Sequence, residues 1–184
     1  HCDSAQPQLV AAENNVFGCG YNSDMTEQAP NAHLTAAIWH WDVYYQAAIE
    51  TAMTCGGAEN FVTEMGGNAY YAGLSEGFVD ASTLNELVAA PGTAAAMEAV
   101  RELIDSGEWD VFSGVKLNIT VDAEAGTAAV EQVDAPLMSD GYELKDGEVV
   151  EMANPEIVPA GGASVTDDVI KSGMNYNVAG VVEG

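Results

Sequence analysis

The stretch VFGCGYNSDM, residues 16–25, decides which fold we expect. It begins as a short apolar run typical of a buried strand, and it ends in the polar side chains of Asn22 and Asp24. Open α/β sheets bind their ligands beside the carboxyl ends of the strands. A strand with an amide and a carboxylate at its exit therefore predicts a ligand-binding edge at this point of the chain.

A second apolar run, LTAAIWHW at residues 34–41, also ends in unusual side chains. Trp39 and Trp41 flank His40, and alternation along a strand is expected to place both indoles on one side. Two interpretations stay open. The indoles pack as core, or they form a flat platform for a stacked ring. Tyr44 and Tyr45 follow closely and enlarge the aromatic patch.

The remaining pattern predicts α/β architecture with a parallel sheet and flanking helices. Helices are expected at residues 4–14, from Asp42 to about residue 55, and at residues 93–107. We expect one or two strands in residues 61–82 and another at residues 109–114. Period-two alternation then begins, and Asp146-Gly147 within YELKDGEVVEM is typical of a type I′ hairpin turn.

These patterns predict three segments. Residues 1–114 are expected to form an α/β lobe whose first strands lie upstream of His1, in a chain that has been processed or truncated. Residues 115–155 are expected to be a β-rich insertion, with strands near 115–153. Residues 156–184 are expected to return to the α/β body with an extended Pro/Gly segment, a short helix and a final strand.

The charge excludes several classes of partner. The chain has 29 Asp and Glu residues against four Lys and Arg residues, a formal net charge of -25. Nucleic acid and anionic lipid are therefore not expected to bind, because both are recognised through Lys and Arg. So acidic a surface is typical of a halophilic protein, in which salt screens self-repulsion. No apolar run is long enough to span a membrane.

No catalytic, metal or cofactor motif stands out. The three Cys residues show no Cys-x-x-Cys spacing, so neither a zinc site nor a full disulfide framework is indicated, and the pairing of Cys2, Cys19 and Cys55 stays open. The three His residues are too dispersed for a helical metal pair. We therefore expect a protein that is not an enzyme and has no cofactor.

Several stretches together resemble a known family. Residues 1–45 contain HCDS, GYNSDM and LTAAIWHWDVYY in order, and this arrangement is similar to the second half of the basic membrane protein family. Residues 106–114, SGEWDVFSG, and residues 156–182, EIVPAGGASVTDDVIKSGMNYNVAGVV, resemble later parts of that family. Its members are substrate-binding lipoproteins that deliver nucleosides to ABC importers.

The resemblance implies a lobe of the type I periplasmic-binding-protein fold, an extracytoplasmic location, an ABC permease as partner and an upstream lobe that completes the cleft. By the same resemblance, Asp24 would bind ribose hydroxyls with support from Asn22, and Asp3 and Ser4 would lie at the edge of the cleft. Trp39 would stand where a related branch has a ligand-reaching lysine, and Trp41 would belong to the same patch.

A different class of function is also open. An α/β lobe without its first strands would expose an unpaired edge, which invites pairing with another chain. The alternative is therefore a self-assembling extracellular or surface protein, a homo-oligomer that uses the predicted hairpin as its docking strand.

Overall fold

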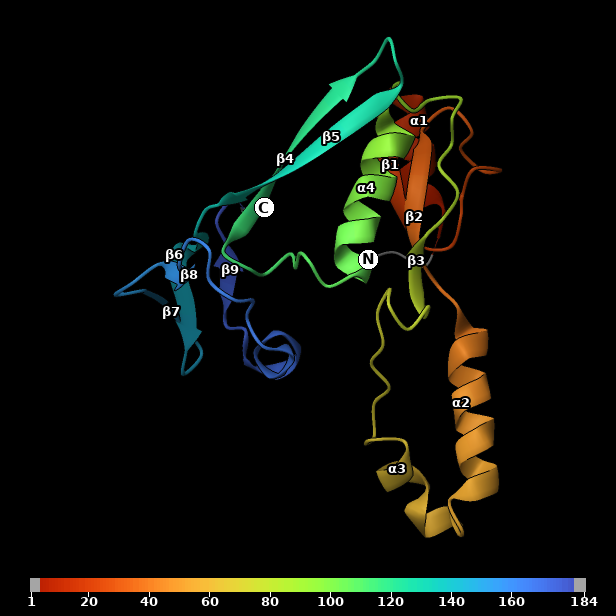
Figure 1. The fold of residues 1–184 in the computed structure, drawn as a ribbon, viewed down its shortest axis with the longest axis vertical. Helices are drawn as coiled ribbons and strands as arrows, with labels where there is room; N and C mark the ends of the chain where they lie inside the picture. Colours follow the sequence, from red (N-terminus) through yellow and green to blue (C-terminus); the bar gives the residue numbers. More distant parts are fainter. Residues whose placement is uncertain (1–3, 181–184) are drawn as a thin grey trace. The chain divides into compact units, whose positions relative to one another are not determined.

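The computed structural model describes residues 4–180, and contacts between residues divide the chain into two units, His1–Ala94 and Ala95–Gly184. Each unit has its own sheets. We describe the units separately (Figure 1).

The first unit is built on a three-stranded sheet in the order β1-β2-β3. β1 (Gly18–Asn22) pairs with β2 (His33–Trp39) in parallel, and β2 pairs with β3 (Val79–Ala81) in the antiparallel sense. Helix α1 (Gln6–Glu13) carries a Pro in its first turn and contacts β1. The sheet is mixed, and the link between its parallel strands, residues 23–32, is made of turns.

The core of this unit is small and unusually polar. Its buried apolar side chains are those of Met25, Ala29, Ala32, Ala36 and Phe78, and its buried polar side chains are those of Gln8, His33, Ser82 and Asn85. Hydrogen bonds compensate for most of this burial, although Gln8 Oε1 and His33 Nδ1 are buried without a hydrogen-bond partner in the part of the chain that the structure describes. The Nδ2 group of Asn85 donates to the carbonyl oxygens of Pro30 and His33, both at 2.8 Å. Ser82 Oγ accepts from the Ala36 N–H at 2.9 Å.

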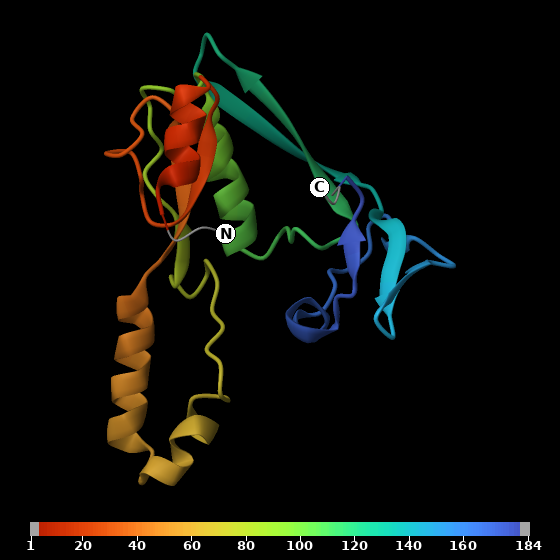
Figure 2. The same cartoon turned by 180° about the vertical axis from the view of Figure 1, so that it is seen from behind.

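A helical arm leaves the end of β2 and returns to β3. It consists of α2 (Trp41–Thr54), the short 3₁₀ helix η1 (Ala58–Asn60) and α3 (Phe61–Glu64). Figures 1 and 2 both show α2 extending away from the sheet, with α3 beside its far end. Neither α2 nor α3 has a buried residue, so the arm is mostly surface. An extended segment then leads back to β3.

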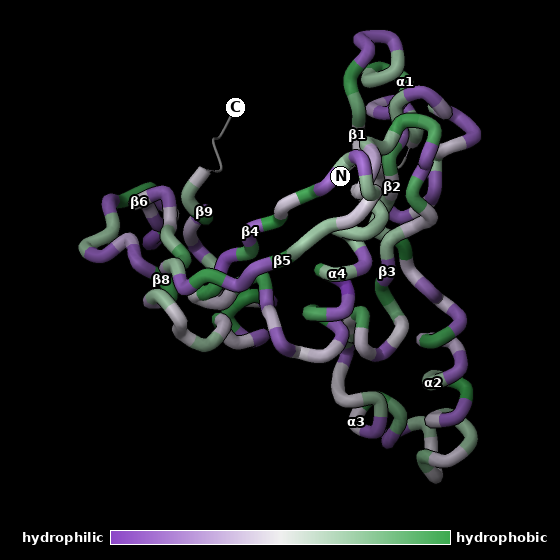
Figure 3. Tube along the Cα trace, turned by 45° about the horizontal axis from the view of Figure 1, so that its top comes forward, coloured by the Kyte–Doolittle hydropathy of each residue, from purple (hydrophilic) through white to green (hydrophobic). Residues whose placement is uncertain are grey.

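The second unit contains two antiparallel sheets. Helix α4 (Thr93–Asp105) spans the boundary between the units and is followed by the hairpin of β4 (Val115–Asp122) and β5 (Thr127–Asp134). β6 (Leu137–Lys145) pairs with β7 (Glu148–Glu151), β8 (Glu156–Val158) and β9 (Tyr176–Val178), and the π-helix η2 (Val169–Gly173) precedes β9. Hydrophobic and hydrophilic residues alternate along β4 (Figure 3).

The prediction of a lobe of the periplasmic-binding-protein type, with a parallel sheet, is wrong. The chain is mixed α/β, but among the described residues only β1 and β2 pair in parallel, and every other strand pair is antiparallel. The physical reason lies in the connections. No helix crosses between β1 and β2, and the arm carries the chain out and back, so that β3 enters beside β2 in the opposite direction.

The expectation of one or two strands in residues 61–82 is confirmed by β3 alone, while residues 61–64 form α3. The strand expected at residues 109–114 is wrong, because this segment turns and Asp110 Oδ1 accepts from the Phe112 N–H at 2.7 Å. Helix α4 and the β-rich run from residue 115 are confirmed. So is the hairpin turn, where Asp146 and Gly147 have φ of 53° and 84°.

Candidate ligand-binding site

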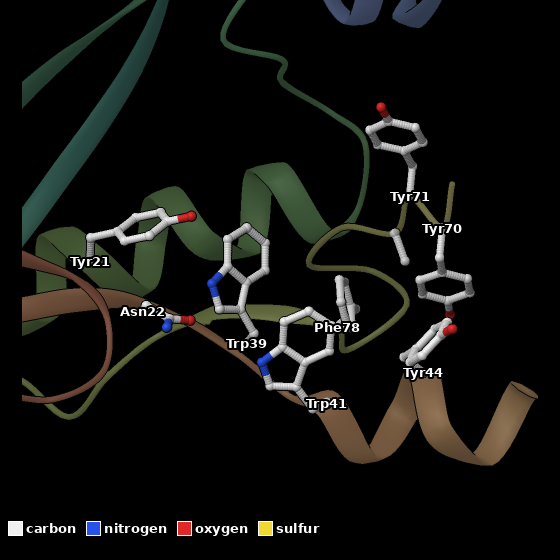
Figure 4. Close-up of a pocket in the computed structure, with 9 residues that line it drawn as sticks. Tyr21, Asn22, Trp39, Trp41, Tyr44, Tyr70, Tyr71 and Phe78 are labelled. Atoms are coloured by element: carbon white, nitrogen blue, oxygen red, sulfur yellow. The ribbon is translucent and has the colours of Figure 1, made fainter. Parts of the chain in front are cut away.

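The first unit contains an aromatic hollow of about 600 Å³. It is lined by Tyr21, Asn22, Trp39, Trp41, Tyr44, Tyr70, Tyr71, Ala72 and Phe78. Figure 4 shows Trp39 and Trp41 between Tyr21 on one side and Phe78 on the other, with Tyr44, Tyr70 and Tyr71 continuing the row. A volume of this size accommodates a small organic molecule.

Local backbone structure explains why these rings meet. β2 ends at Trp39 and α2 begins at Trp41, so strand alternation stops at His40 and the two indoles are tilted by 45° to one another. The His40 N–H donates to the carbonyl oxygen of Phe78 at 2.8 Å, which fixes the start of the arm against its return. A turn at Gly77, with φ of 70°, brings Phe78 to this position.

The rings pack at the angles that aromatic quadrupoles favour. Trp41 lies edge-to-face with Tyr44 and with Phe78, at interplanar angles of 86° for both pairs. Tyr21 and Trp39 make a similar contact at 80° with 6.1 Å between ring centroids. Such pairs add roughly 0.5–1.5 kcal/mol each beyond their buried area. Trp41 is nevertheless 50% exposed, so the rings form a wall facing solvent as well as a partial core.

A polar hollow of about 260 Å³ adjoins the aromatic one, and both are lined by Tyr21 and Asn22. Ser4, Ala5, Ser23, Asp24, Met25 and Gln28 complete its lining. Asn22 has a φ of 72°, a left-handed conformation that Asn tolerates better than most residues. Within residues 4–180 its side-chain amide makes no hydrogen bond, which leaves both its donor and its acceptor groups for a ligand.

Asp24 is held in place and kept ionised by its neighbours. Its Oδ1 atom accepts hydrogen bonds from the Thr26 hydroxyl at 2.6 Å and from the Thr26 N–H at 2.8 Å. The hydroxyl bond and then the backbone bond lower the pKa of Asp24 from its ordinary 3.8, with a smaller contribution from His33. Oδ2 has no protein partner among the described residues, so an ionised oxygen remains available in the polar hollow.

His33 contacts the loop that carries Asp24. Its ring is fully buried, and its Nε2 atom accepts the Met25 N–H at 3.3 Å and lies 3.5 Å from Asp24 Oδ1. His33 therefore anchors the loop that carries Asp24 to the start of β2.

The structure brings together most of the residues that the sequence suggested. Asn22, Trp39 and Trp41 line the aromatic hollow, and Ser4, Asn22 and Asp24 line the polar one. Asp3 lies outside the described residues. Trp41 is not a strand residue but the first residue of α2, so the helix that was expected from Asp42 begins one residue earlier.

Sequence reasoning missed the far wall of the site, formed by Tyr70, Tyr71 and Phe78. The segment that contains them was expected to form strands, but residues 65–78 are turns and extended chain. The doublet Tyr70-Tyr71 was the available signal, because binding residues concentrate on loops and a tyrosine combines an apolar ring with a polar hydroxyl.

No family model and no curated protein matches this chain. The resemblance to the basic membrane protein family therefore stays a prediction from the quoted motifs. Among residues 4–180, no helix combines the length and the apolar character that crossing a membrane requires. The two hollows and their lining residues are thus the basis on which a function is proposed.

Proposed function

We propose that this protein is a solute-binding protein whose first unit holds a small ligand with a flat ring and hydroxyl groups, a nucleoside being the class that fits best. One observation carries the proposal: an aromatic hollow of about 600 Å³ opens beside a polar hollow, and the two share Tyr21 and Asn22. A ligand with an apolar ring at one end and hydroxyls at the other matches this pairing.

Each end of the ligand has its own partners in this proposal. The ring stacks on the wall that contains Trp39 and Trp41, and base–aromatic stacking of this kind is worth about 1–3 kcal/mol per base. The hydroxyls donate to Asp24 Oδ2 and exchange hydrogen bonds with the Asn22 amide. A carboxylate acceptor makes a stronger hydrogen bond than a neutral one, so Asp24 is the main polar contact.

The biological role that we propose is capture outside the cytoplasm and delivery to an ABC permease, with no chemical step. The sequence resemblance supports this role, and the site supports it because stacking and hydrogen bonding hold a ligand without altering it. Recognition is assigned to the first unit alone, since every lining residue of both hollows belongs to it.

The proposal is tested by titrating the full chain with adenosine, uridine and ribose, using calorimetry and tryptophan fluorescence. Two of the three Trp residues line the aromatic hollow, so a Trp109→Phe background confines the fluorescence to the site. Trp39→Ala or Trp41→Ala is expected to weaken nucleoside binding about 5-fold to 150-fold. Failure of every nucleoside to bind in the millimolar range would refute the proposal.

Matched variants separate recognition from folding. Phe17→Ala removes another exposed aromatic ring of the same unit that lines neither hollow, and it should leave affinity unchanged. Asn22→Gly removes the amide while keeping the left-handed backbone unstrained. Asp24→Asn keeps the shape of the carboxylate but removes its charge. Both polar variants should weaken nucleosides more than the free base.

Self-assembly is the second candidate function, and one observation favours it. β4 and β5 pair only with each other in the part of the chain that the structure describes, so both outer edges of this hairpin are open. This hairpin replaces the one around Asp146-Gly147 as the proposed contact, because β6 of that hairpin already pairs with β8 and β9 as well as with β7. Ile119 and Val121 on β4 are 47% and 44% exposed. A two-stranded hairpin is marginally stable by itself, and pairing with another copy would cover its edges.

Native mass spectrometry decides between a single chain and an assembly. If the β4–β5 hairpin is the contact, Ile119→Lys should reduce a large species to single chains, whereas Val149→Lys on the exposed surface of β7 should not. A wild-type protein that stays a 19.2 kDa monomer at high concentration would exclude this second function.

A further inference from the structure

We infer that the aromatic hollow selects a positively charged organic ligand over a neutral ligand of the same shape. The inference rests on the proposed function, because it concerns the charge of a molecule held in the same hollow. Three features of the first unit lead to it: the faces of its aromatic rings, the sign of its charges and the size of the hollow.

The rings offer negative faces to a cation. The face of an aromatic ring attracts a cation within about 6 Å of its centroid, and Trp attracts most strongly. Seven of the nine lining residues are aromatic, and two of these are Trp. In an edge-to-face pair only one ring presents a face to its neighbour. Trp41 and Tyr71 are half or more exposed, so ring surface remains for a ligand.

The charges of the unit act in the same direction. Residues 1–94 contain eleven Asp and Glu residues and neither Lys nor Arg, since Arg101 is the first Lys or Arg of the chain. Asp24, whose pKa is lowered by hydrogen bonds from Thr26, lines the polar hollow that shares Tyr21 and Asn22 with the aromatic one. The positive end of the α2 dipole lies at Trp41, but Asp42 in the first turn offsets it.

The size and chemistry of the hollow exclude a bare metal ion. Among the described residues no group of three or more His, Cys, Asp or Glu side chains is arranged to hold a metal. A hollow of about 600 Å³ lined by rings suits an organic cation, such as an N-methylated heterocycle or a trimethylammonium group. An anionic ligand finds no Lys or Arg of this unit to pair with.

The test compares pairs of ligands that differ in charge and little in shape, at one ionic strength, with the full chain. The first pair is 1-methyladenosine, a cation at neutral pH, and adenosine, which is neutral. The second pair is choline and its neutral isostere 3,3-dimethylbutan-1-ol. Calorimetry is expected to show each cation binding about tenfold more tightly than its neutral partner, within a range of about 2-fold to 30-fold.

Variants link the preference to the rings. Trp41→Leu keeps an apolar side chain but removes the π face, and it should reduce the preference for the cation to about twofold or less. Tyr71→Leu provides a second test on an exposed ring whose loss is not expected to affect folding. Phe17→Leu, outside both hollows, should keep the full preference, and circular dichroism verifies that each variant is folded.

The outcomes separate this inference from the proposed function. Adenosine that binds as tightly as 1-methyladenosine, or more tightly, overturns the inference and leaves the nucleoside proposal standing. If neither nucleoside binds but choline binds more tightly than its isostere, the nucleoside proposal fails and the cation preference holds. If no probe binds, both are overturned.

Discussion

Gly20 lies in β1 at a position with no room for a methyl group. A Cβ atom added there would lie 2.8 Å from Cε1 of His33, 3.1 Å from Cβ of Ala36 and 3.3 Å from the carbonyl oxygen of Ser23. His33 and Ala36 are 0% and 1% exposed, so neither has free space to move into. Inserting a methyl group into a packed core costs about 1–3 kcal/mol, and we expect Gly20→Ala to destabilise the pairing of β1 with β2 by this amount.

Hydrogen exchange of the intact protein measures this effect where it occurs. Exchange of the amides of β1 and β2 through opening of the sheet should accelerate by about 5-fold to 150-fold in Gly20→Ala. Gly73→Ala is the matched control, because its added Cβ would meet only Oε2 of Glu76, at 3.4 Å. Unchanged protection in Gly20→Ala, or an equal loss in Gly73→Ala, would show that the packing argument is wrong.

Three further predictions follow from contacts and charge. Asn85→Asp removes the amide donors that reach the carbonyl oxygens of Pro30 and His33 and places a carboxylate against them. Chemical denaturation should therefore show a free energy of unfolding lower by at least about 2 kcal/mol. A smaller decrease would contradict the bridging role of Asn85. The pKa of Asp24 is lowered in the folded protein, so its ionised form stabilises the fold above the ordinary value of 3.8, and this contribution disappears as the pH falls through the lowered pKa. Thr26→Val should therefore raise the Asp24 pKa in an NMR titration, and an unchanged value would contradict the assignment of its cause. Finally, a net charge of -25 predicts that the melting temperature rises as sodium chloride is added, and a steady fall would exclude it.

Features that depend on neighbouring residues, such as a turn or a single helix, were predictable from the sequence. The turn at Asp146-Gly147 was predictable because a type I′ turn needs two residues that tolerate positive φ, and the structure pairs Lys145 with Glu148 across it. Helix α4 was predictable from the spacing of its apolar residues. In both cases the deciding interactions lie within a few residues of one another.

The direction of β3 could not be predicted from the sequence. β3 pairs with β2 after an excursion through α2, η1 and α3, and no residue near Val79 specifies from which end the chain returns. Residues 61–64 have the apolar composition of a strand, but they continue the arm as a helical turn. The alternation of predicted strands and helices therefore suggested a parallel sheet, but the observed connections give a mixed one.

The site residues at the ends of β1 and β2 were predictable from the sequence, whereas those contributed by the returning arm were not. The predictable residues are those at or just beyond the ends of β1 and β2, namely Asn22, Asp24, Trp39 and Trp41. Their proximity depends only on the parallel pairing of these two strands and not on the direction of β3. Tyr70 reaches the hollow only because the arm folds back and places its ring 5.2 Å, between centroids, from those of Tyr44 and Phe78. That distance is a property of the tertiary fold.

The turn-built link between β1 and β2 also affects how such a site can change over time. The segment that carries Asp24 is the one that Met25 and His33 tie into the buried core, so a substitution there alters both recognition and stability. Tyr71 and Ala72 belong to an extended segment that pairs with no strand among the described residues. Mutation can therefore reshape the half of the hollow that selects a ring at little risk to the sheet. We expect a lineage of such proteins to diverge in the rings they accept sooner than in the hydroxyls they hold.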